Sequence, residues 1–160
     1  MSGRWKPVAL AAGAALVVAF VGGAVTDTGP WYQALRKPWF QPPDWLFAPA
    51  WTLIYSLTAM AGVLSWRAAA AGPEREWLLV AFALNGFLNV LWSLLFFGLR
   101  RPDWALIEVV FLFLSVASLV WVAGRHSRMA GLLLLPYLAW VGFAGVLNLA
   151  VVRLNGPFGA

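Results

Sequence analysis

Five long apolar runs dominate this sequence, and each is long enough to cross a lipid bilayer as a helix. Backbone groups in lipid must be hydrogen-bonded within the protein, so uninterrupted runs of this kind form helices. We expect spans at about residues 7–26, 48–66, 77–99, 104–123 and 129–152. The sequence therefore predicts one all-α membrane domain over residues 1–160, a bundle of five transmembrane helices with a structured loop between the first two.

The composition fits a membrane protein and excludes several other classes. Hydrophobic residues make up 62% of the chain and charged residues 11%, against about 45–50% and about 25% in soluble domains. The net charge of +5 comes from basic residues scattered at the ends of the apolar runs, where they anchor helices to headgroups, so we expect no nucleic-acid partner. These residues divide almost evenly between the two sides, which leaves the orientation open. The absence of cysteine excludes disulfides and cysteine nucleophiles.

The first apolar run has two interpretations. Basic residues precede it, and Gly22, Gly23 and Ala24 lie at its end, as in a cleaved signal peptide. Ala15, Ala19 and Gly23 also recur at four-residue spacing, which creates a smooth face for close packing between membrane helices. The second feature favours a retained helix, but this segment alone leaves both interpretations open.

The connection at residues 27–47 is dense in proline, tryptophan and charge. Pro38, Pro42 and Pro43 fix their own φ angles and bias the preceding residues toward extended conformations, so we expect a stiff loop. We expect Pro49 in the first turn of the following helix, where its missing N–H costs nothing. A stiff, aromatic connection of this kind predicts a folded lid over one mouth of the bundle.

Polar and aromatic residues form stripes on three of the predicted helices. The stripes are Trp51 with Tyr55, Asn85 with Asn89 and Trp92, and Trp140 with Ala144, Leu147 and Asn148. Buried amides in lipid need partners, so these stripes face inward. They have two interpretations: the asparagines only join neighbouring helices, or the stripes line a pocket below the lid for a flat, mostly apolar ligand.

Two titratable residues stand apart from these stripes. Glu108 is the carboxylate at membrane depth, and such residues are functional candidates by default. We favour a simpler interpretation, an interfacial ion pair with the turn at Arg100 and Arg101. His126, the only histidine, lies in a predicted turn, so we expect a solvated loop residue and neither a histidine triad nor a multi-histidine metal site. We therefore expect no metal site and no obligatory cofactor.

Three motifs make the chain resemble the tryptophan-rich sensory protein/translocator protein (TspO/MBR) family, also called peripheral-type benzodiazepine receptors. The motifs are Lys37-Pro38 with Pro42-Pro43-x-Trp45-x-Phe47-x-Pro49-x-Trp51 and Tyr55; Leu88-Asn89-x-x-Trp92-Ser93-x-x-Phe96-Phe97-Gly98; and Pro136-Tyr137-Leu138-Ala139-Trp140 with Phe143-Ala144, Leu147-Asn148 and Arg153-Leu154-Asn155. Their order, and their spread over nearly the whole chain, make the resemblance specific. It implies that the first span is a retained helix.

The resemblance implies an integral membrane receptor or translocator, often a homodimer, that binds porphyrins such as protoporphyrin IX and haem and is linked to tetrapyrrole regulation or stress responses. The family's ligand contacts map onto Tyr32, Trp51, Asn89, Trp140, Ala144 and Leu147. With the stripes above, the expected ligand-binding set is Tyr32, Trp51, Tyr55, Asn89, Trp92, Trp140, Ala144, Leu147 and Asn148. Some bacterial members promote light-dependent porphyrin breakdown, which implicates Trp51 and Trp140. That activity and a ligand-free membrane scaffold are the alternatives.

The chain departs from the family pattern at two positions. Phe40 stands where a tryptophan is common, and Leu149 replaces the tyrosine at the centre of the family's proposed cholesterol motif. Cholesterol is a ligand of the mitochondrial members, and we expect it to bind poorly here. The alanine- and arginine-rich composition suggests a bacterial source, and with it a bacterial cell membrane.

Overall fold

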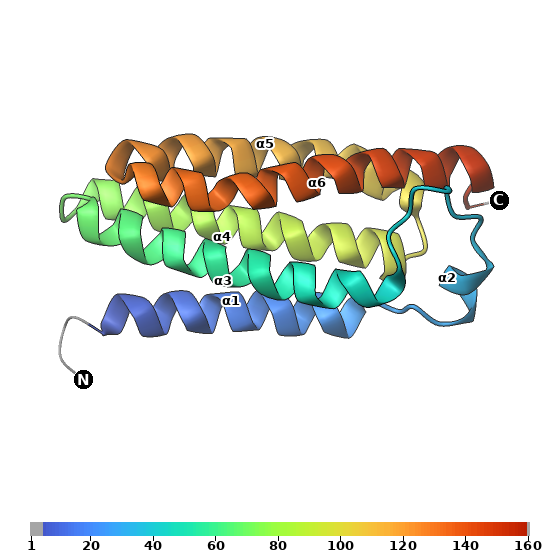
Figure 1. The fold of residues 1–160 in the computed structure, drawn as a ribbon, viewed down its shortest axis with the longest axis horizontal. Helices are drawn as coiled ribbons and strands as arrows, with labels where there is room; N and C mark the ends of the chain where they lie inside the picture. Colours follow the sequence, from blue (N-terminus) through green and yellow to red (C-terminus); the bar gives the residue numbers. More distant parts are fainter. Residues whose placement is uncertain (1–4, 160) are drawn as a thin grey trace.

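A computed structural model describes residues 5–159. Within this range the chain forms, in order, α1 (Lys6–Val25), α2 (Pro30–Ala34), α3 (Asp44–Ala68), α4 (Pro73–Ser93), the π-helical turn η1 (Leu94–Gly98), α5 (Pro102–His126) and α6 (Arg128–Asn155). Five helical segments are long and apolar enough to span a membrane, namely α1, α3, α4 with η1, α5 and α6. They run side by side along the long axis of the molecule (Figure 1). The predicted five-helix bundle is confirmed.

Large apolar side chains cover the outside of the bundle. Leu16 is 69% exposed, Phe20 78% and Ile107 65%. Such a surface matches the hydrocarbon of a bilayer, whereas in water it would drive association. Six of the eleven tryptophans are also exposed and lie near helix ends or in the lid, as interfacial aromatic residues do: Trp5, Trp39, Trp45, Trp77, Trp104 and Trp121. The chain is an integral membrane protein.

The five spanning helices form a closed ring of contacts, and the aliphatic core lies between α3, α4, α5 and α6. Around this ring, α1 packs on α3, α3 on α6, α6 on α5, α5 on α4, and α4 on α1. Aliphatic side chains fill the interior, among them Ile54, Leu112, Val116, Leu134 and Val141. The ring brings the inward stripes of α3, α4 and α6 toward one another.

The connection between α1 and α3 folds over the end of the bundle at which α6 terminates (Figure 1). Asn155 at the end of α6 holds it there, because its Oδ1 accepts a hydrogen bond from the Arg36 N–H (2.7 Å) and its Nδ2 donates to the Arg36 carbonyl (2.9 Å). Within the connection, Gln41 Nε2 donates to the Tyr32 hydroxyl (3.2 Å). The predicted structured loop is confirmed, and we call the segment from 26 to 43 the lid.

The helix α3 begins earlier than predicted. Leu46 N–H already donates to the Pro43 carbonyl (2.9 Å), and the negative charge of Asp44 suits the first turn of a helix. Pro49 consequently lies inside α3, and the prediction of its position in the first turn was wrong. Because proline has no N–H, the carbonyl of Trp45 loses its helical partner. Trp45 is 71% exposed, so this part of the helix lies at the surface.

The lid end of the third span is wound more widely than an α-helix. Leu99 N–H donates to the carbonyl of Leu94 (2.8 Å), five residues earlier, and Arg101 N–H donates to Leu95 (2.9 Å). Two neighbouring rings of this turn contact the lid: Phe96 is buried and packs on Trp31, and Phe97 packs on Tyr32. π-Helical turns are frequent at functional sites.

Candidate ligand-binding site

A network of side-chain hydrogen bonds joins α3, α4, α5 and α6 in the half of the bundle nearer the lid. The Tyr55 hydroxyl of α3 donates to Asn89 Oδ1 of α4 (2.8 Å), and Asn89 Nδ2 donates to the Tyr137 hydroxyl of α6 (3.0 Å). One turn earlier in α4, Asn85 Nδ2 donates to Ser115 Oγ of α5 (2.9 Å). Both asparagines are 4% exposed. They therefore join neighbouring helices, as the first interpretation of the stripes predicts.

Aromatic rings surround this network, and we call Trp51, Tyr55, Tyr137 and Trp140 the ring cluster. Trp51 stacks on Tyr55 with the ring centroids 5.3 Å apart. It meets Tyr137 and Trp140 edge-on, at 6.2 Å and 6.4 Å. The two indoles come from α3 and α6, so the ring cluster bridges these helices. It offers the kind of aromatic surface on which a flat ring packs.

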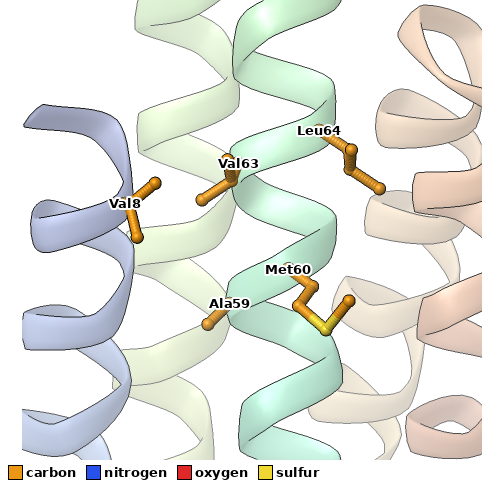
Figure 2. Close-up of a pocket in the computed structure, with 5 residues that line it drawn as sticks. All are labelled: Val8, Ala59, Met60, Val63 and Leu64. Atoms are coloured by element: carbon orange, nitrogen blue, oxygen red, sulfur yellow. The ribbon is translucent and has the colours of Figure 1, made fainter. Parts of the chain in front are cut away.

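An open groove of about 430 Å³ lies beside the ring cluster, between α3 and α6. Its lining residues come from the lid and both helices: Pro42, Ala50, Leu53, Ile54, Pro136, Ala139, Trp140 and Phe143. Trp140 belongs to both the groove and the ring cluster. A smaller groove between α1 and α3 has an aliphatic lining of Val8, Ala59, Met60, Val63 and Leu64 (Figure 2). It contains none of the predicted site residues.

A second group of contacts lies closer to the lid. Trp92 Nε1 donates to Asn148 Oδ1 (3.2 Å), and Asn148 Nδ2 donates to the carbonyl of Pro102 at the start of α5 (2.9 Å). The Trp92 ring stacks on Phe96 of η1 at 5.1 Å. These contacts join the lid-proximal ends of α4, α5 and α6, and we call Trp92, Phe96 and Asn148 the mouth cluster.

Tyr32 connects the lid to η1, next to the mouth cluster. Its ring packs against Phe97 with the centroids 5.5 Å apart, and the Lys37 ammonium lies 4.1 Å from the Tyr32 ring centroid. Burial, together with the carboxylate of Asp44, raises the pKa of the Tyr32 phenol. The hydroxyl is the group that accepts the hydrogen bond from Gln41 within the lid.

The predicted site residues fall into two adjoining groups. Trp51, Tyr55, Asn89 and Trp140 lie in or beside the ring cluster, and Tyr32, Trp92 and Asn148 lie in or beside the mouth cluster. Ala144 and Leu147 are half-buried on α6, in the stretch of that helix between the two groups. Beside them is Gly145, whose Cβ position would lie 3.6 Å from Val109 of α5. The small residues of α6 thus lie between the two clusters.

Sequence reasoning missed two residues of this region. Tyr137 is 2% exposed and accepts the hydrogen bond from Asn89. Tyr137 lies one turn before Val141 and two turns before Ala144, on the inward stripe of α6. Helical periodicity could therefore have identified it from the sequence. Phe143 packs on Trp140 at 5.9 Å and lines the groove. No spacing distinguishes it from the lipid-facing phenylalanines of this chain.

The two titratable residues singled out by the sequence are not where we expected them. Arg101 pairs with Asp103, its Nε lying 2.8 Å from Oδ1, and the predicted ion pair with Glu108 was wrong. Asp103 is closer along the chain, so the arginine is neutralised at the helix start while Glu108 faces inward. His126 ends α5 with its Nδ1 3.6 Å from Glu74 Oε2. It is half-buried there, so the expectation of a solvated loop residue was also wrong.

The chain is similar to known proteins over most of its length. The TspO/MBR family pattern matches residues 10–154. The tryptophan-rich protein TspO of Archaeoglobus fulgidus is 40% identical over 144 residues, which cover 89% of this chain and 92% of that protein. TspO of Chlorobaculum tepidum is 39% identical over 154 residues (92% and 95%). The translocator protein of Sus scrofa is 39% identical over 127 residues (78% and 75%).

Proposed function

Because this chain belongs to the TspO/MBR family of membrane proteins, we propose that it is a receptor or translocator for porphyrins such as protoporphyrin IX and haem. The observation that carries the proposal is the ring cluster beside an apolar groove. In this cluster the ring centroids of Trp51 and Trp140 lie 6.4 Å apart. We further propose that it acts in tetrapyrrole regulation or a stress response, as a homodimer in a bacterial cell membrane.

The aromatic surface fits the apolar disc of a porphyrin. Each well-packed aromatic pair contributes about 0.5–1.5 kcal/mol beyond the area it buries, and the ring cluster offers several such surfaces. The groove beside it is lined almost entirely by apolar side chains and shares Trp140 with the ring cluster. A ligand dissolved in the bilayer thus reaches this indole between α3 and α6 without crossing water.

The charged edge of a porphyrin has a different requirement, since propionates are costly to bury. Basic residues gather at the lid end of the bundle, where Arg36 and Lys37 lie in the lid and Arg100 lies beside Trp31. Propionates at this end would meet these cations close to the headgroups. The proposed orientation therefore places the disc inside and the carboxylates at the lid.

A second candidate function, light-dependent porphyrin breakdown, is favoured by the same pair of indoles. An indole is electron-rich, so it could give one electron to a photoexcited porphyrin stacked on Trp51 or Trp140, and molecular oxygen would then be the oxidant that opens the porphyrin ring. No metal, cysteine or histidine chemistry is needed for this step. Cholesterol, by contrast, is not proposed as a tight ligand, because Leu149 has no hydroxyl group to offer it.

A titration in the dark tests the proposal. The purified protein in lipid nanodiscs is titrated with protoporphyrin IX while tryptophan fluorescence is followed. Saturable quenching is expected, because the porphyrin lies against Trp51 and Trp140. Quenching that rises without saturation would reject the receptor and favour the scaffold. Repeating the titrated sample under light and oxygen separates the two ligand-binding functions, since only the degrading protein destroys bound porphyrin.

A further inference from the structure

Glu108 in α5 is a buried carboxyl that takes no part in the contacts described above. It is 6% exposed and lies on the inner stripe of the helix, between Ala105 (0%) and Leu112 (3%). Neither of its carboxyl oxygens has a hydrogen-bond partner within residues 5–159. A buried polar group without a partner is costly, so the position of Glu108 indicates a partner that the chain itself does not supply.

The surroundings of Glu108 place it between the ring cluster and the mouth cluster. Its chain neighbour Val109 packs toward α6. A Cβ atom added to Gly145 of α6 would lie 3.6 Å from the Val109 side chain. On the same stripe, Ala105 packs with Phe96 of the mouth cluster, and Leu112 belongs to the buried core that includes Tyr137 of the ring cluster. At this level α6 presents two small residues, Ala144 and Gly145, whose side chains occupy little space. Glu108 therefore lies inside the bundle at the level between the two clusters, the level of Ala144 on α6.

Within residues 5–159, none of the ion pairs involves Glu108. The ion pairs found in the described part of the chain join Lys37 to Asp44, Arg101 to Asp103 and His126 to Glu74. The side chains that the neighbouring α4 and α6 present at this depth are amides, tyrosine and tryptophan. A carboxyl at membrane depth without a counter-charge is best held as the neutral acid, which keeps a carbonyl oxygen free to accept a hydrogen bond.

We infer that Glu108 is the polar recognition group of the ligand site, and that its carboxyl accepts a hydrogen bond from an N–H of a flat apolar ligand lodged against Ala144. The inference rests on the proposed function and deepens it by naming the ligand group that the protein recognises, an N–H. Ring N–H groups lie in the apolar body of a tetrapyrrole, away from its carboxylates. Glu108 would therefore favour a metal-free ring that carries N–H groups, such as protoporphyrin IX, over a ring of the same shape without one, such as haem.

The infrared band of a protonated carboxyl tests this directly in the unmodified protein. The chain has six carboxylate side chains. Asp27, Asp44, Glu74 and Glu76 are exposed and Asp103 is paired with Arg101, so a protonated-acid band reports Glu108. Carbazole and 9-methylcarbazole differ only at the ring nitrogen. Carbazole should shift the carbonyl stretch to lower frequency, 9-methylcarbazole should leave it in place, and the band should vanish in Glu108→Gln.

Affinities measured by calorimetry in nanodiscs give the second test. Glu108→Leu should bind carbazole about tenfold more weakly and 9-methylcarbazole unchanged, because one hydrogen bond is lost. Glu108→Gln should retain carbazole, since its amide oxygen still accepts. The control Glu76→Gln removes an exposed carboxylate at the far end of the bundle and should change nothing.

Three results would overturn the inference: no band shift with either compound, equal losses for both compounds in Glu108→Leu, or undiminished carbazole binding by Glu108→Leu. Failure of the proposed function would give a different result, because that function is tested by the binding of protoporphyrin IX to the unmodified protein. Saturable porphyrin binding with any of the three results overturns the inference alone. No binding of either porphyrin or carbazole overturns both.

Discussion

Two groups of tryptophan side chains differ in their environment in this protein. Trp39 in the lid is 95% exposed, and the other exposed indoles lie near helix ends, where membrane interfaces favour them. Trp51 and Trp140 instead contact each other inside the bundle. Composition alone cannot separate the two groups, since a high tryptophan count is compatible with either. Only the second group has the position that ligand stacking or photochemistry requires.

Replacing either inner indole by phenylalanine should separate binding from photochemistry. We expect Trp51→Phe and Trp140→Phe to retain most of the affinity for protoporphyrin IX, because phenylalanine still supplies stacking area. They should lose most light-dependent degradation, if the unmodified protein shows any, because phenylalanine is far harder to oxidise. Absorbance loss under light is compared with dark affinity. Undiminished degradation in both variants would show that the two indoles take no part in the photochemical step.

Filling the space beside Ala144 should block the ligand. Ala144→Phe adds a ring to the half-buried stretch of α6 between the two clusters. We expect protoporphyrin IX to bind at least about tenfold more weakly, since the site cannot expand without strain. The matched control is Val146→Phe, which places the same ring at a position that is 57% exposed to lipid. Equal affinities of the two variants in dark titrations would exclude Ala144 from the site.

The sequence predicted the inward amides correctly, because helical periodicity and the cost of an unpaired amide in lipid both place Asn85 and Asn89 inside. It could not predict their partners. Asn89 bonds Tyr55 and Tyr137, which come from helices that periodicity does not orient toward one another. Glu108 illustrates the same limit, since its nearest cation along the chain was already paired with Asp103.

Among the elements, the lid separates features that local sequence determines from features that depend on distant residues. Its prolines predicted stiffness, and the structure adds the short helix α2 (Pro30–Ala34) and the two hydrogen bonds between Arg36 and Asn155. The distance of 119 residues along the chain between these partners is beyond any local pattern. The same holds for η1, because a 3.6-residue period does not indicate where a helix widens.

Removing the Asn155 contact should loosen the lid without unfolding the bundle. Asn155→Ala deletes both hydrogen bonds to the Arg36 backbone, at about 1 kcal/mol each. We expect faster hydrogen exchange in residues 26–43 and faster porphyrin release, with the melting temperature of the helices nearly unchanged. Arg153→Ala, an exposed residue of the same helix end, is the control. Exchange unchanged from the parent protein would show that other contacts hold the lid.

The α5–α6 hairpin depends on a close backbone approach. A Cβ on Gly131 would lie 3.0 Å from both Gly124 Cα and the Val120 carbonyl oxygen. We expect Gly131→Ala to destabilise the bundle by about 1–3 kcal/mol, because backbone must shift to admit the methyl group. Thermal denaturation in detergent measures this. Gly13→Ala in α1, where the added Cβ would meet no atom from another helix within 4 Å, should be neutral or slightly stabilising. Similar melting temperatures for both variants would contradict the packing argument.

For the molecule as a whole, span number was predictable and span arrangement was not. Bilayer thickness fixes how many apolar residues a crossing needs, so five runs predict five spans. The order of helices around the ring depends on which faces pack together, and the apolar surfaces of these helices look alike in sequence. Only the polar stripes indicated the inner faces of α3, α4 and α6. Site residues are therefore predicted best where polar side chains show which helix face is buried. They are predicted least well where the helix face carries only aliphatic side chains.

Hydrogen exchange over the whole chain, in the dark and with or without protoporphyrin IX, tests the central claim that the ligand lies under the lid. The account predicts slower exchange in the lid, at the start of α3 and around η1, with no change in the turns at 69–72 and 127 at the opposite end of the bundle. Slower exchange at that opposite end, or none anywhere despite saturable binding, would contradict it.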